Sequence, residues 1–222
     1  MDNYDQILQT ITLAMGAAWA SGVNLYAALL TLGVLGVTGN MALPPELQVL
    51  EHPMVLAAAG LMFAVEFCAD KVPGLDTGWD AIHTFIRIPA GALLAAGAIG
   101  EVTPALTVAA AIVGGTISAG SHITKSGSRV LINASPEPVS NWLASLTEDV
   151  MVMGGIWLSI THPYIFLTCF ILFLILMVWL LPRIWQGVKK IFAFLARPFR
   201  PTPAAPAHRH HHGRQPPDTP ER

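Results

Sequence analysis

Charged and polar side chains recur inside segments of this chain that are otherwise apolar. Glu66 and Asp70 are four residues apart in one such segment. Asp80, His83 and Arg87 stand at positions i, i+3 and i+7 near the start of the next. Side chains at these spacings lie on one face of an α-helix. Carboxylates and imidazoles held together away from water can bind protons or cations, and an arginine among them can neutralise a carboxylate or contact an anion.

Six apolar segments are available to carry these side chains across a membrane. Of the 222 residues, 53% are hydrophobic and only 12% are charged, whereas a soluble protein has about 25% charged residues. A bilayer core about 30 Å thick requires about 20 helical residues. The sequence therefore predicts an all-α integral membrane protein, a bundle of about six transmembrane helices. The predicted spans are 7–37, 53–71, 81–100, 104–121, 140–160 and 163–182.

The distribution of Lys and Arg predicts which face is cytoplasmic. If six segments alternate in direction, the loops near 38–52, 101–103 and 161–162 share one face and contain no Lys or Arg. The other loops and the C-terminal tail then hold all twelve. Basic residues resist translocation and remain cytoplasmic. We therefore expect both termini in the cytoplasm.

The first predicted span carries a polar stretch, Ser21-Gly22-Val23-Asn24, near its middle. At about 1.5 Å of rise per residue, Asn24 lies close to the bilayer midplane. Two interpretations stay open: a continuous tilted helix with one packed polar residue, or a broken or re-entrant helix that lines a polar cavity. The small residues of 11–30 favour an interior helix, because they allow close approach of neighbouring backbones. The segment 163–182 is apolar all round and is expected to face lipid.

Segment lengths draw charged residues into the membrane. Residues 88–100 supply only about 20 Å of helix, so that span must begin near Asp80. Residues 150–160 supply only about 16 Å, so their span must begin near Ser140. Such placement of ionised groups usually marks a functional site. The resulting candidates for a polar cavity are Asn24, Glu66, Asp70, Asp80, His83, Arg87, His122, Glu148 and Asp149.

Acids outnumber bases in this layer, since Arg87 is its one permanent cation. The surplus carboxylates must bind protons, bind a cation or face water. The structural alternative is a buried salt bridge between Arg87 and Glu148 or Asp149 that fixes helix register.

Two loops predicted at 70–87 and 122–141 are long and rich in polar residues, unlike the loops of the other face. They add a second group of candidates on the cytoplasmic face. The loop candidates are Lys71, Asp76, Lys125, Arg129 and Glu137.

No metal site or other cofactor is predicted, because the chain has no HExxH or CxxC spacing.

The C-terminal part divides into two regions after the bundle of residues 1–182. Residues 183–200 predict a basic amphipathic helix next to the membrane, suited to anionic lipid. Residues 201–222 are rich in Pro, Arg and His and predict a disordered tail.

Three stretches carry a resemblance to a known family: ASGVNLY (20–26), ADKVPGLDTGWDAIHTFIRIPAGALLA (69–95) and HITKSGSRVLINASPEPVSNWLASLTEDV (122–150). They resemble the bacterial membrane family called domain of unknown function 4126, over roughly residues 7–182. The resemblance implies a multi-pass protein of the bacterial cytoplasmic membrane. It implies no activity, and it assigns no catalytic or binding residues.

Three functions are compatible with these features. The first is a small transporter or channel-like protein for an unknown solute or ion, with a protonatable vestibule on the cytoplasmic side. The second is a membrane scaffold with a closed salt-bridge network. The third is an enzyme acting on lipid headgroups with His83 and Glu148 as acid and base. Beyond the bilayer, we expect no nucleic-acid partner, and a homo-oligomer fits the small size of the bundle.

Overall fold

The computed structural model describes residues 3–72, 74–134 and 138–195, and every regular element in these ranges is a helix. Glu137 and the predicted tail of 201–222 lie outside the described residues. Prolines open most of the helices, where their missing N–H needs no partner. The elements are α1 (Asn3–Val37), the 3-10 helix η1 (Pro45–Glu51), α2 (Pro53–Ala69), α3 (Leu75–Ala98), α4 (Pro104–Asn133), α5 (Pro138–Thr161) and α6 (Pro163–Leu195).

Five of these helices are long and apolar enough to cross a membrane: α1, α3, α4, α5 and α6. The 3-10 helix and α2 meet the same test together, but they are bent by 69° where they join. The all-helical class is confirmed for the described residues, and the several apolar helices indicate a multi-pass membrane protein.

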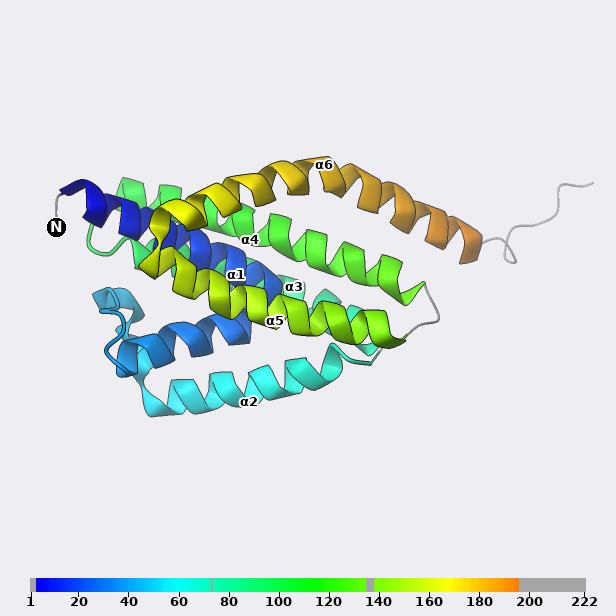
Figure 1. Ribbon diagram of the computed structural model, residues 1–222, viewed down its shortest axis with the longest axis horizontal. Helices are drawn as coiled ribbons and strands as arrows, with labels where there is room; N and C mark the ends of the chain where they lie inside the picture. Colours follow the sequence, from blue (N-terminus) through cyan, green and yellow to red (C-terminus); the bar gives the residue numbers. More distant parts are fainter. Residues whose placement is uncertain (1–2, 73, 135–137, 196–222) are drawn as a thin grey trace, which may run out of the picture.

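Helix α1 reverses direction in the middle of the bundle. Asn24 interrupts it with an extended backbone, φ −146° and ψ 99°. Gln6 near the start of α1 and Leu47, which follows its end, each share a groove with Val102 of the α3–α4 connection. Both ends of α1 therefore lie at the same end of the bundle, as Figure 1 shows. The helix is a re-entrant hairpin with Asn24 at its apex.

The reversal changes the expected topology. The first segment does not pass through the bundle, so the described ends Asn3 and Leu195 lie at opposite ends of the molecule (Figure 1) rather than at one face. Hydropathy reports that a segment is apolar but not that it turns back. The charge pattern survives the change, because the connections at the end that holds Val37 still carry no Lys or Arg.

Two helix boundaries differ from the predicted spans. Helix α3 begins at Leu75 instead of near Asp80, and α4 continues past 121 to Asn133. Lys125 and Arg129 are therefore buried residues of α4 and not loop residues. These two basic residues lower the hydropathy of the stretch, but their side chains extend into the bundle and form ion pairs with acidic side chains there.

Loop candidates and the C-terminal helix complete the comparison. Lys71 lies in the α2–α3 connection as expected, but Asp76 is buried in the first turn of α3. Helix α6 runs without interruption through Pro182 to Leu195, so the basic residues that follow 182 continue the same helix.

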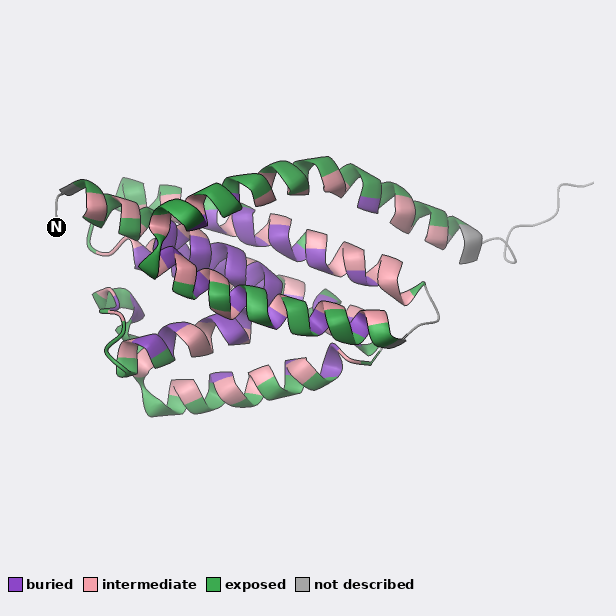
Figure 2. Cartoon of the chain, in the orientation of Figure 1, coloured by how far each residue is buried: buried purple, intermediate pink, exposed green. Residues whose placement is uncertain are grey.

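Small side chains place α1 at the centre of the bundle. Ala17, Ala18, Ala20, Ala27 and Ala28 are at most 1% exposed. Figure 2 shows α1 mostly buried and α6 mostly exposed. The interior position of α1 follows from the close approach that alanine and glycine permit, and the exposed apolar surface of α6 suits contact with lipid.

We predict that a methyl group at Gly22 destabilises the fold. A Cβ at this position overlaps the Ser121 hydroxyl and the Ser118 carbonyl oxygen of α4. Such overpacking costs about 1–3 kcal/mol, so Gly22→Ala should lower the unfolding midpoint measured by circular dichroism in detergent.

Gly154→Ala is the matched control, because a Cβ at Gly154 in α5 has no described atom within 4 Å. It should leave the midpoint unchanged or raise it slightly, since alanine favours helix over glycine by up to about 1 kcal/mol. Equal midpoints for the two variants would contradict the close α1–α4 contact.

Candidate functional site

A cluster of charged side chains fills the bundle beside the apex of α1. We call this set the charged cluster. All of its side chains are at most 2% exposed except that of Glu148, which is 18% exposed. Four helices and the residue that ends α2 supply its members. They are Glu66, Asp70, Asp80, Arg87, Lys125, Arg129 and Glu148.

Lys125 of α4 is the centre of the charged cluster. Its Nζ lies 3.0 Å from Asp70 Oδ2 and 3.3 Å from Glu66 Oε1. Glu148 Oε2 is 3.5 Å away and Asp80 Oδ1 is 3.8 Å away. One ammonium group thus connects α4 to carboxylates of α2, α3 and α5 and to that of Asp70, the residue that follows α2. A charge buried this deeply is tolerated because it is paired.

Arg87 of α3 joins the charged cluster to the apex. Its guanidinium pairs with Glu66 and lies 2.9 Å from Asp80 Oδ1. The same group donates a hydrogen bond to the Val23 carbonyl oxygen at 3.2 Å. That carbonyl ends the first half of α1, where the helix dipole favours a positive charge. Arg87 therefore satisfies both the acids and the interrupted backbone.

Arg129 closes the charged cluster on the side away from the apex. It binds Glu148 through two nitrogens, at 3.3 Å to Oε1 and 2.7 Å to Oε2. It also donates to Asn141 Oδ1 at 2.7 Å and to the Asp70 carbonyl at 3.1 Å. This two-point geometry fixes α4 against α5 and the end of α2.

The observed pairs differ from the expected salt bridge. Arg87 pairs with Glu66 and Asp80, whereas Glu148 pairs with Arg129 and Lys125. Within the charged cluster, three cations face four carboxylates. The acid surplus is therefore smaller than expected, because two cations assigned to a loop belong to the cluster.

Asn24 stabilises the apex with both ends of its amide. Its Oδ1 accepts a hydrogen bond from the Ala27 N–H at 2.9 Å, which is the geometry of a helix N-cap. Its Nδ2 donates to Asp149 Oδ1 at 2.8 Å. The interpretation of a broken helix is thus the correct one, and a carboxylate lies at the start of the second half, where the helix dipole favours negative charge.

Both candidate histidines have partners at both ring nitrogens, and for His122 the hydrogen bonds define the tautomer. Arg87 can only donate, so His122 Nδ1 at 3.3 Å accepts, and Nε2 donates to Thr84 Oγ1 at 2.7 Å. The His122 ring is therefore neutral. His83 Nδ1 donates to the Trp79 carbonyl at 2.9 Å, and its Nε2 lies 3.1 Å from the Tyr26 hydroxyl, which can either donate or accept.

These contacts give the enzyme hypothesis no support. No hydrogen bond or ion pair joins His83 to Glu148 within the described part of the chain. The described residues also contain no group of three His, Cys, Asp or Glu side chains able to hold a metal ion.

The two loop candidates outside the charged cluster have local roles. Lys71 Nζ donates to the Phe67 carbonyl at 3.0 Å and lies over the Phe67 ring. Burial lowers the pKa of the Lys71 ammonium from its ordinary value. Asp76 accepts hydrogen bonds from the Thr77 N–H and from Asn133 Nδ2, and so ties the start of α3 to the end of α4.

Sequence reasoning missed two polar partners of the site. On α5, Asn141 and Ser145 are buried on the same face as the predicted Asp149, at the spacing i, i+4 and i+8. The next buried positions of that face, Val152 and Ile156, are apolar. The spacing alone could have shown that this face is polar at one end and apolar at the other.

Some buried carboxylate oxygens have no hydrogen-bond partner among the described residues. They are Glu66 Oε2, Asp70 Oδ1, Asp80 Oδ2 and Asp149 Oδ2. An unpartnered buried oxygen is costly, so each is a place for water or a proton.

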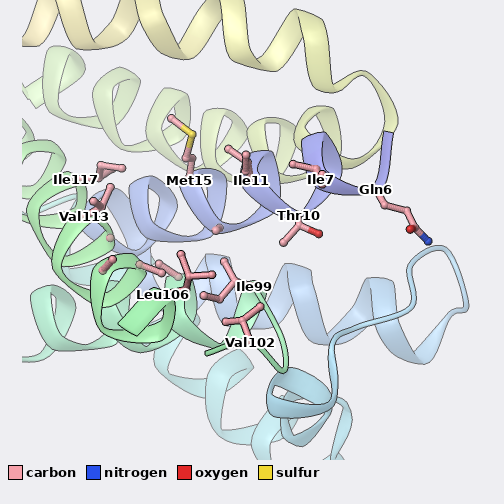
Figure 3. A pocket seen from close by; sticks show the side chains of 15 residues that line it. Gln6, Ile7, Thr10, Ile11, Met15, Ile99, Val102, Leu106, Val113 and Ile117 are labelled. Carbon is pink, nitrogen blue, oxygen red and sulfur yellow. The ribbon is translucent and has the colours of Figure 1, made fainter. Parts of the chain in front are cut away.

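An apolar groove of about 650 Å³ lies at the other end of the bundle, away from the charged cluster. The first half of α1, the end of α3 and the start of α4 line it, and Figure 3 shows Ile7, Ile11, Ile99 and Leu106 among its side chains. No charged side chain lines this groove, whereas the charged cluster lies beside the apex.

Comparisons with known proteins place residues 11–183 within the family described as domain of unknown function (DUF4126). No curated protein and no solved structure matches the chain.

We predict that removal of the Lys125 charge destabilises the bundle. Lys125→Met keeps most of the side-chain volume but leaves four carboxylates with less compensation. Breaking a buried ion pair typically costs about 3–5 kcal/mol. The unfolding midpoint and the yield of folded protein should both fall.

The exposed Lys190→Met change on α6 is the control and should have no effect. Adding Asp70→Asn to Lys125→Met should recover part of the lost stability, because it removes one unpaired carboxylate. A Lys125→Met protein as stable as wild type would show that the cluster is not held by these pairs.

Proposed function

Since this chain belongs to the family described as domain of unknown function (DUF4126), whose description names no activity, we propose its function from the geometry of the apex. The protein is a small membrane transporter for a solute or ion, seen in a conformation closed to solvent. The observation that carries this proposal is the reversal of α1 at Asn24 beside the charged cluster.

Broken helices inside a membrane are costly unless neighbouring groups replace the lost backbone hydrogen bonds. Transporters use such breaks to bring helix ends to a binding site near the bilayer midplane. Here the two half-helix ends meet charges of the favourable sign, Arg87 at the C-terminal end and Asp149 beyond the N-cap Asn24.

The buried face of α5 suggests from which side a solute or ion reaches the apex of α1. From the apex to the α4–α5 connection, the buried side of α5 carries Asn141, Ser145 and Asp149. On the other side of the apex, Val152 and Ile156 are buried against the apolar core. Glu148, the one member of the charged cluster with a partly exposed side chain, lies on the polar side. Passage across the apolar side requires a rearrangement of the helices.

Location and lipid contact belong to the same proposal. We place the protein in the bacterial cytoplasmic membrane with the charged cluster toward the cytoplasm, because that end holds the basic residues. Helix α6 has 33 residues, or about 50 Å of helix, which exceeds a bilayer core of about 30 Å. Its exposed Lys189 and Lys190 therefore extend to the interface, where they suit anionic lipid.

A membrane scaffold is the second candidate. The observation that favours it is the close pairing of three cations with four carboxylates in a layer that is almost entirely buried. In a scaffold this layer stays closed, whereas in a transporter it opens to water during the cycle.

Thiol labelling distinguishes the two candidates without knowledge of the substrate. Cys68 and Cys169 are free and exposed, so both are first replaced by serine. Ser21→Cys then introduces a thiol beside the apex, where the native hydroxyl donates to the Arg87 carbonyl at 2.9 Å. We expect a membrane-impermeant methanethiosulfonate reagent to label it in intact vesicles.

Ser159→Cys is the matched control, because Ser159 is also fully buried and its hydroxyl donates to the Ile156 carbonyl at 2.7 Å in the apolar part of the bundle. It should stay unlabelled. Absence of labelling at both positions, in protein shown to be folded, would reject the transporter and favour the scaffold.

A further inference from the structure

We propose that Asp149 is a reversible proton-binding site and that its proton is the coupling ion of the transport function proposed above. The coupling role rests on that function, whereas proton binding itself stands on the surroundings of Asp149. The bound species is a proton and not a metal ion, because the described residues provide no group of three acidic, His or Cys ligands.

Asp149 differs from the carboxylates of the charged cluster in having no cation partner. Each of those four acids has a Lys or Arg nitrogen within 4.0 Å. Asp149 is 5% exposed, and no described Lys or Arg forms an ion pair with it. A buried carboxylate without a counter-ion favours its neutral form.

Hydrogen bonds do not compensate for the missing cation. Asp149 Oδ1 accepts one bond, from the neutral amide of Asn24, and Oδ2 has no partner among the described residues. Asp76 shows the contrast. It is also buried without an ion pair in the described part of the chain, but it accepts bonds from Gly74, Thr77 and Asn133, and both of its oxygens are used.

Charges from the surrounding elements act on Asp149 through space. Lys125 of α4 and Lys71 of the α2–α3 connection favour its carboxylate form, and Asp70 at the end of α2 opposes it. The start of the second half of α1 also favours the carboxylate through its dipole. None of these charged groups forms an ion pair with Asp149 among the described residues.

We propose that the proton reaches Asp149 from water along the polar face of α5. Asn141 and Ser145 lie on the same buried face of α5, between Asp149 and the α4–α5 connection. A proton from water at that end forms an O–H bond at Oδ2, and the carboxylate loses its negative charge. Release reverses the step and returns the proton to water, so nothing is oxidised or reduced.

Protonation of Asp149 acts directly on the apex. A carboxylate accepts a stronger hydrogen bond from the Asn24 amide than a neutral carboxylic acid does. Asn24 is also the N-cap of the second half of α1. Gain of the proton therefore weakens the contact that holds the hairpin to α5, and loss of the proton restores it.

Infrared titration of the purified full-length protein in lipid nanodiscs tests the site. A protonated carboxyl group has a C=O stretching band that a carboxylate lacks. We expect wild-type protein to show such a band that titrates reversibly with pH. D149N should lose the titrating band, whereas D76N, the matched change of a fully hydrogen-bonded buried aspartate, should retain it.

A second variant separates loss of the proton site from loss of the fold. D149E keeps a carboxyl group at the position and should shift the frequency of the titrating band without removing it. Wild-type protein with no titrating band, or a band unchanged in both D149N and D149E, would overturn the proposal. Loss of the band when sodium replaces potassium at constant pH would also overturn it, because the site would then bind a metal cation.

The two proposals fail independently. A titrating band from Asp149 together with an unlabelled Ser21→Cys thiol would keep the proton site and reject its coupling role. A labelled Ser21→Cys thiol with no titrating band from Asp149 would keep the transporter and reject the proton site.

Discussion

Backbone N–H and C=O groups in the hydrocarbon core of a membrane have no water to replace a lost hydrogen bond, and the break in α1 leaves such groups at its apex. The Val23 carbonyl and the Ala27 N–H lie at a point where the helix no longer pairs its own backbone. Arg87 and Asn24 replace those bonds. Bringing a guanidinium to this depth then requires Glu66 and Asp80, and those acids in turn share Lys125. The charged cluster thus begins with the partners of one interrupted helix and continues with the ions that neutralise those partners.

Close packing makes this compensation possible. Gly22 of α1 lies directly against Ser118 and Ser121 of α4. Ser118 and Ser21 both donate to the Arg87 carbonyl at 2.9 Å, so α1, α3 and α4 meet around one main-chain oxygen. The Ser21 and Ser118 hydroxyls therefore bind the Arg87 main chain, while the acids bind its guanidinium.

Much of the charged layer could be predicted from the sequence, because thirteen apolar residues cannot span a bilayer and must take Asp80 and Arg87 with them. The direction of α1 could not, since a re-entrant hairpin and a long span have the same composition. The burial of Lys125 and Arg129 was readable from their i, i+3 and i+7 spacing with His122, but their charge made a loop the simpler interpretation. That Asp149 has no cation partner depends on side-chain positions from four elements, which no spacing reveals.

The hairpin also sets the order in which the molecule can be completed. The ribosome makes α1 before α3 and α5, yet those helices supply the groups that satisfy its apex. Until Asp149 has been synthesised, the interrupted backbone at Asn24 lacks part of its support. Helix α1 can therefore complete its contacts only after α5 has joined the bundle, although it is synthesised before α3, α4 and α5.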